Sequence, residues 1–131
     1  MNQFLRFCVV GSVGFMIDAG ILQLLVSGVG SNPYLARLIS FLLAASATWS
    51  MNRRYTFKVE HRPTHAEWSR YIALMVLGAL VNYGLFAISI TVWELARAQP
   101  WLGVAVGSIA GLGINFLTSR LLVFRNTCET N

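Results

Sequence analysis

Charged residues are scarce in this chain of 131 residues. Asp, Glu, Lys and Arg make up 11% of it, whereas hydrophobic residues make up 56% and the mean hydropathy is +0.60. In a soluble domain about a quarter of the residues are charged, and so few charges do not cover the surface of a water-soluble fold of this size. The scarcity excludes a soluble domain and indicates an all-α integral membrane protein.

Cysteine and sets of catalytic groups are scarce as well. The two cysteines, Cys8 and Cys128, do not have the spacing of metal ligands, so we interpret both as free thiols. The sequence has no nucleophile with a base at reachable spacing, no pair of carboxylates in one hairpin, and no glycine loop that would hold a phosphate. We therefore expect no enzymatic activity, no cofactor and no metal.

Four apolar runs occupy most of the chain, and each has about the 20 residues that a helix needs to cross a bilayer. They cover about residues 5–26, 34–51, 71–93 and 101–119, with a polar loop at 52–70. A signal peptide is the rival interpretation of the first run. That run is too long for one, contains an acid and recurs in mid-chain. Residues 1–131 are therefore interpreted as a single transmembrane domain.

The distribution of basic residues predicts the orientation of the spans. The net charge is +5, and most of the basic side chains flank apolar runs, which is typical of topology signals and does not favour nucleic-acid binding. Counting along the four spans places eight Lys and Arg on one side and two on the other. The eight are Arg6, Arg53, Arg54, Lys58, Arg62, Arg70, Arg120 and Arg125, and the two are Arg37 and Arg97. This bias predicts that both termini and the 52–70 loop are cytoplasmic.

The two halves of the chain share a pattern that indicates an internal duplication. At an offset of 64 residues (70 − 6 = 64), Arg6, Gly14 and Asp18 of the first run correspond to Arg70, Gly78 and Asn82 of the third. At an offset of 67 (107 − 40 = 67), Ser40, Ala44, Thr48 and Asn52 of the second run correspond to Gly107, Gly111, Asn115 and Ser119 of the fourth. Both of these sets step by four, so each forms a stripe of mostly small residues on one helix face. We expect two parallel two-helix repeats, at about 4–58 and 68–126.

Two charged residues lie inside the apolar runs. Asp18 is twelve residues from Arg6, about 18 Å along a helix, and Arg37 is fifteen residues from Asn52, about 22 Å. Their similar depth and their small-residue faces predict that they pair. An ionisable group in mid-membrane is a functional candidate because it is costly to place there. The pair is either a lock between helices or part of a polar cavity in which Arg37 binds an anion.

The remaining candidate residues are two polar residues of the second half and a basic cluster after the second span. Asn82 keeps a polar group where the second repeat has lost the acid, and Asn115 is either an interhelical hydrogen-bonding group or part of a polar lining. The cluster Asn52, Arg53 and Arg54 is either a topology signal or a contact for a lipid phosphate. The rest of the loop, including His61 and Glu67, is expected to be solvated.

Several segments in this order resemble the GtrA-like family of small bacterial membrane proteins. They are the opening Arg6-Phe7-x-x-x-Gly11-x-x-Gly14-x-x-x-Asp18, the segment Asn52-Arg53-Arg54-Tyr55-Thr56-Phe57, the second opening Arg70-Tyr71, and the closing Asn115-Phe116 followed by Ser119-Arg120-Leu121-Leu122-Val123-Phe124. The resemblance covers roughly residues 4–126. No single segment is specific, whereas their order within four spans is.

The resemblance implies a role in cell-surface polysaccharide synthesis at the bacterial cytoplasmic (inner) membrane. The leading hypothesis is flippase-type translocation of a polyprenyl-phosphate-linked sugar. The alternative is a non-transporting partner that anchors or stabilises a membrane glycosyltransferase. A small multidrug-type exporter is disfavoured because the basic rim and Arg37 do not suit a cationic substrate. Four spans make a thin bundle, which favours a homodimer or a complex with the transferase.

Overall fold

The computed structural model describes residues 1–125, and within these residues the secondary structure is entirely helical. Four helices are long and apolar enough to span a membrane: Gln3–Gly28, Pro33–Thr56, His65–Val92 and Trp101–Val123. The four predicted spans are therefore confirmed, and the chain is a multi-pass membrane protein. Cys8 is a free thiol. Cys128 lies outside the described residues.

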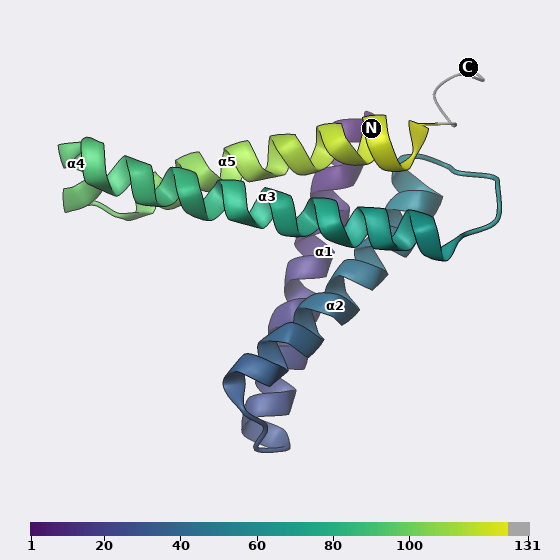
Figure 1. Cartoon of the computed structure of the whole chain (residues 1–131), viewed down its shortest axis with the longest axis horizontal. Helices are drawn as coiled ribbons and strands as arrows, with labels where there is room; N and C mark the ends of the chain where they lie inside the picture. The colour runs from purple at the N-terminus through teal and green to yellow at the C-terminus, as the bar shows by residue number, and fades with distance from the viewer. Residues whose placement is uncertain (126–131) are drawn as a thin grey trace. The chain divides into compact units, whose positions relative to one another are not determined.

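The chain divides into two compact units, residues 1–72 and 73–125, each built around one helix hairpin. In the first unit, α1 (Gln3–Gln23) continues as a π-helical turn, η1 (Leu24–Gly28). After a short turn, α2 (Pro33–Met51) runs back along α1 and ends in a second π turn, η2 (Asn52–Thr56) (Figure 1). Asn2 and Asn32 cap α1 and α2, because their side chains accept from backbone N–H groups of the first turn.

The second unit contains most of α3 (His65–Val92), the short α4 (Glu94–Ala98), and α5 (Trp101–Thr118), which continues as the π turn η3 (Ser119–Val123). Figure 1 shows α3 and α5 side by side. Arg97 satisfies carbonyl groups at the end of α3, donating to Ile90 O at 3.1 Å and to Thr91 O at 2.5 Å. A cation at this position also suits the negative end of the helix dipole.

The polar loop is shorter than the predicted 52–70, because both neighbouring helices extend into it. η2 carries the second span to Thr56, and α3 begins at His65 instead of Tyr71. The start of α3 is capped by Thr64, whose hydroxyl accepts from the backbone N–H of Glu67 at 3.1 Å. At the other end of the loop, Lys58 has a φ of 51°, which reverses the chain after η2.

Small residues lie in the interface of the first hairpin, as the stripe on the second span predicts. Ala36 and Ser40 are fully buried, and Ala44 is 6% exposed. A Cβ atom on Gly14 of α1 would collide with the side chain of Thr48. Glycine at this position lets the two backbones approach closely enough for the helices to pack without large side chains.

The second hairpin has a similar interface, with closely packed glycines on both of its helices. Gly103, Gly107 and Gly111 of α5 are buried. A Cβ atom on Gly111 would lie 3.1 Å from the carbonyl oxygen of Gly78 and 3.1 Å from the Cβ of Asn82. A Cβ atom on Gly78 would in turn collide with the side chain of Asn115.

Matching features of the two hairpins occur at the offsets found in the sequence. The contact of Gly14 with Thr48 corresponds to that of Gly78 with Asn115 (78 − 14 = 64; 115 − 48 = 67). Both closing π turns end in the same backbone bond, from Phe57 N–H to Asn52 O at 2.8 Å and from Phe124 N–H to Ser119 O at 2.9 Å. These equivalences support the internal repeat, which stays a prediction.

Candidate functional site

An ion pair joins the two helices of the first hairpin, as the depths of the two residues predict. Nη1 of Arg37 donates to Oδ2 of Asp18 at 2.5 Å. Asp18 lies ten residues before the end of its span at Gly28 (28 − 18 = 10), about 15 Å along the helix. It is therefore well inside a hydrocarbon layer about 30 Å thick. A charge-assisted hydrogen bond of this kind is strong, and it reduces the cost of placing both charges in the span.

The two partners are unequally shielded. The Asp18 side chain is 16% exposed, whereas that of Arg37 is 57% exposed. Oδ1 of Asp18 is buried, and no described residue donates a hydrogen bond to it. The carboxylate is thus held on one side by Arg37 and left unsatisfied on the other, while the guanidinium remains accessible.

The second hairpin has no charge at the corresponding positions. Asn82 lies against the glycine face of α5, with its backbone carbonyl and side-chain oxygen next to Gly107. Oδ1 of Asn115 is buried without a partner among the described residues, although an interhelical hydrogen bond was one expectation for it. The structure thus places Asn82 and Asn115 in the packing interface of their own hairpin.

Asn52 belongs to a buried hydrogen-bond network, an arrangement that leaves its amide little capacity for a lipid phosphate. Its Nδ2 donates to the hydroxyl of Tyr71 at 3.0 Å, and its Oδ1 accepts from Thr56 Oγ1 at 2.7 Å. The Tyr71 hydroxyl donates in turn to Thr48 Oγ1 at 3.2 Å. Asn52 and Tyr71 are each 1% exposed. The network attaches the first turns of α3 to the end of α2.

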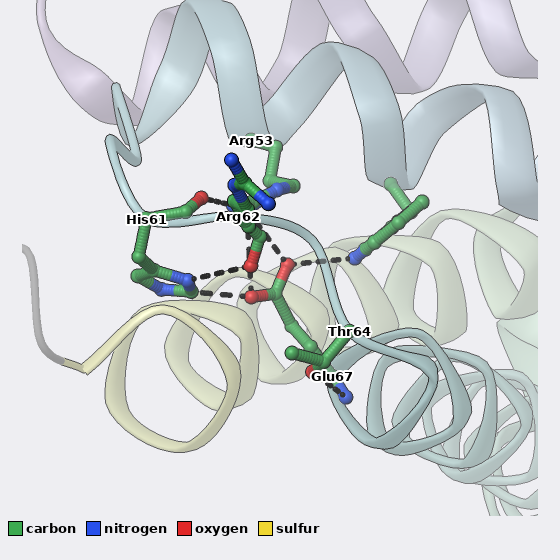
Figure 2. A network of polar contacts seen from close by, with 6 residues as sticks. Arg53, His61, Arg62, Thr64 and Glu67 are labelled. Atoms are coloured by element: carbon green, nitrogen blue, oxygen red, sulfur yellow. Dashed lines mark hydrogen bonds and ion pairs between the residues drawn. The ribbon is translucent and has the colours of Figure 1, made fainter.

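Arg53 is also engaged internally, in a buried ion pair with Glu67 (Figure 2). Its Nη1 lies 3.3 Å from Glu67 Oε1, and its Nη2 donates to the backbone carbonyl of His61. The same Oε1 accepts from Trp49 Nε1 at 3.0 Å, and Glu67 Oε2 lies 3.6 Å from His61 Nε2. The side chains of Arg53 and Glu67 are 9% and 6% exposed.

The expectation of a solvated loop was therefore wrong for Glu67. Its carboxylate folds inward because Arg53 and Trp49 donate to it, and Nε2 of His61 lies 3.6 Å from Oε2, so that burial leaves neither oxygen without a polar neighbour. The sequence contains a local signal for this segment, the Thr64-x-x-Glu67 spacing of a helix start. That signal locates the helix but does not identify the distant partner of the carboxylate.

Arg54 is the member of the cluster that faces outward. It is exposed, and its guanidinium carbon lies 5.6 Å from the centre of the Tyr55 ring. Arg6 approaches the same place from α1, with its Nη1 donating to the carbonyl of Tyr55 at 3.1 Å. Lys58, four residues after Arg54, is also exposed. The basic rim, defined as Arg6, Arg54 and Lys58, presents cationic groups at the end of the hairpin opposite the turn between α1 and α2.

These features define a class: a small multi-pass membrane protein whose first hairpin contains an ion pair within the spans and a basic rim at one end. Residues 6–127 match the family described as GtrA/DPMS, transmembrane domain. The chain therefore belongs to this family, as its sequence segments predict. The chain is also 25% identical over 127 residues to a protein of Salmonella phage P22 named bactoprenol-linked glucose translocase. The match covers 96% of this chain and 98% of the phage protein.

Proposed function

We propose that this protein translocates a polyprenyl-phosphate-linked sugar across the bacterial cytoplasmic membrane, for cell-surface polysaccharide synthesis or glycan modification. The observation that carries the proposal is the accessible arginine inside the first hairpin of a chain that aligns almost end to end with a lipid-linked glucose translocase. A phosphate that crosses the bilayer needs a cation along its path, because an unpaired charge in hydrocarbon is expensive.

The first hairpin offers a cation at each of two positions along such a path, one at the membrane surface and one within the span. Arg54 in the basic rim and Arg37 are seventeen residues apart on one continuous helical segment (54 − 37 = 17), about 26 Å at 1.5 Å per residue. In this proposal the lipid phosphate first meets the rim, where arginine side chains can form forked hydrogen bonds with it, and then reaches Arg37 in the opposite half of the span. Asn52 and Arg53 support the rim by fixing the end of α2.

The second hairpin has a different part in this proposal. Its matching positions carry Asn82 and Val104, so it offers a phosphate no cation at these two positions. Asn82 and Asn115 instead add polar atoms beside a closely packed glycine interface. We propose Asn82 and Asn115 as hydrogen-bonding groups for a sugar, whose hydroxyl groups need such partners but no charge.

The proposed orientation has both termini and the loop between α2 and α3 in the cytoplasm. It rests on the excess of eight Lys and Arg over two between the two sides. The sugar lipid then enters from the cytoplasmic leaflet at the basic rim and leaves near the turn between α1 and α2.

A membrane glycosyltransferase that makes or uses the sugar lipid is the proposed protein partner. A homodimer is the alternative assembly for such a thin bundle.

Reconstituted vesicles test the proposal. Purified protein is inserted into vesicles that contain labelled polyprenyl-phosphate glucose, and the fraction of label reaching the opposite leaflet is followed over time. We expect faster transbilayer movement than in protein-free vesicles, with the lipid recovered chemically unchanged, since translocation breaks no bond. Movement at the protein-free rate, together with recovery of a glycosyltransferase in a pull-down from native membranes, would favour the accessory role.

A further inference from the structure

The carboxylate of Asp18 has one oxygen bonded to Arg37 and one oxygen that is left unsatisfied. Its Oδ2 accepts from Arg37 at 2.5 Å, while its Oδ1 is buried and has no partner among the residues that the structure describes. An ionised oxygen left unsatisfied in such a place is destabilising, because burial has removed the water that would solvate it. A proton on the carboxyl group relieves this cost, but it also weakens the hold on Arg37.

The charge of this site is balanced only while Asp18 and Arg37 remain paired as ions. Within α1, η1 and α2 the other charged residue is Arg6, twelve residues and about 18 Å from Asp18. The other titratable groups of these elements are the thiol of Cys8 and the hydroxyl of Tyr34. η2 adds Arg53 and Arg54, and the nearer of them lies sixteen residues from Arg37 (53 − 37 = 16), about 24 Å along the helical segment. No second cation of the first hairpin is therefore near enough to neutralise an incoming anion.

A phosphodiester that binds Arg37 brings one negative charge. If Asp18 stayed ionised, two anions would share one guanidinium inside the span, and the net charge would be −1. If Asp18 takes up one proton, its carboxyl group is neutral, Arg37 pairs with the phosphodiester, and the net charge returns to zero. Because an uncompensated charge in the bilayer costs several kcal/mol, the protonated state is favoured once the phosphodiester is bound.

We propose that Arg37 exchanges the Asp18 carboxylate for the phosphodiester of the lipid-linked cargo, and that Asp18 takes up one proton for each phosphodiester bound. The inference rests on the proposed function and adds proton coupling to it. The proton adds to the Asp18 carboxylate, Arg37 stays protonated throughout, and no bond of the lipid forms or breaks. When the phosphodiester leaves, Asp18 loses the proton and pairs with Arg37 again. The second hairpin, with Asn82 and Val104, has no equivalent exchange, so the ratio is one proton per chain.

Binding measured as a function of pH tests the exchange. The full-length protein in lipid nanodiscs is titrated with a short-chain polyprenyl-phosphate glucose, whose phosphodiester does not titrate between pH 5.5 and 8. Because binding and protonation are linked, the Kd should rise tenfold per pH unit wherever unliganded Asp18 is ionised. In weakly buffered solution a pH dye should report the uptake of one proton per lipid bound. Binding that is independent of pH and takes up no proton would overturn the proposal.

Variants separate the two residues. Asp18→Asn should bind the lipid with a Kd that no longer depends on pH and without proton uptake, because the neutral amide leaves Arg37 free. Arg37→Gln should lose binding at every pH. Glu94→Gln removes an exposed carboxylate outside the spans and should behave as the unmodified protein. Proton uptake that persists in Asp18→Asn would contradict the assignment. The measurement on the unmodified protein decides the question even if a variant fails to fold.

A second arm identifies the source of the phosphodiester. Phosphatidylglycerol carries the same group, and at a hundredfold excess it should not displace the sugar lipid. If phosphatidylglycerol displaces the bound sugar lipid as well as unlabelled sugar lipid does, the assignment to the cargo is overturned.

Vesicle transport distinguishes this inference from the proposed function. If lipid moves across the bilayer but no proton is bound, the exchange is wrong and the function stands. If binding takes up protons without any movement, the function is wrong and the exchange stands.

Discussion

Breaking the Asp18–Arg37 pair should have unequal effects, depending on which partner is removed. Arg37→Gln leaves a carboxylate that is only 16% exposed and already has one unsatisfied oxygen. Removing one partner of a buried pair costs about 3–5 kcal/mol. Asp18→Asn instead leaves an arginine that is 57% exposed and long enough to turn its charge toward the membrane surface. The Asp18→Asn substitution should therefore lower the stability by about as much as the loss of an exposed pair, about 0–1 kcal/mol.

Thermal unfolding in detergent, followed by tryptophan fluorescence, measures these effects. We expect Arg37→Gln to be the less stable variant by about 2 kcal/mol or more, from the difference between the two ranges. The double change Asp18→Asn/Arg37→Gln should recover most of the lost stability. Equal stability of the two single variants, or no recovery in the double variant, would refute the reasoning.

Three further substitutions test the packing around the candidate site. Gly78→Ala should destabilise by about 1–3 kcal/mol, because the new methyl group would collide with Asn115, whereas Gly84→Ala enters open space and should be neutral or slightly stabilising. Tyr71→Phe should cost about 1–3 kcal/mol by leaving buried polar groups of its network without a partner. Glu67→Gln should cost about 3–5 kcal/mol by leaving a buried arginine without its counter-charge.

The same unfolding measurement checks all three, and each has a result that would contradict it. Gly78→Ala as stable as Gly84→Ala would mean that the helices are not in close contact at that position. An unchanged midpoint for Tyr71→Phe would mean that water satisfies the groups the hydroxyl now bridges. A Glu67→Gln protein of normal stability would show that Arg53 does not depend on this carboxylate.

The Asp18–Arg37 pair could be predicted from sequence because depth along antiparallel helices follows from counting residues. Each residue adds 1.5 Å, and within the first two spans only one acid and one base lie far from the basic rim, both on faces of small residues. The four spans were predictable for a similar reason, since length and hydropathy suffice in a bilayer. The exposure of Arg37 was not predictable, because it depends on how closely neighbouring side chains pack.

The Arg53–Glu67 pair could not be predicted in the same way. The two residues are fourteen positions apart across a polar segment without periodicity, where nothing in the sequence identifies which side chains fold inward. The helix face of Asn52 could be predicted from the stripe of small residues. Its partner Tyr71 could not, because Tyr71 belongs to the next span. Side chains at loop boundaries find their partners through the path of the loop, which the hydrophobic pattern does not encode.

Transbilayer movement by the double variant Asp18→Asn/Arg37→Gln tests the role of Arg37 in translocation most directly. The variant is expected to fold, because it has no unpaired charge, and it lacks the guanidinium proposed to bind the phosphate. Vesicles with the unmodified protein or with Glu94→Gln should move labelled polyprenyl-phosphate glucose, whereas vesicles with the folded double variant should move it no faster than protein-free vesicles. Movement by the double variant at the rate of the unmodified protein would show that the pair is only a lock between helices.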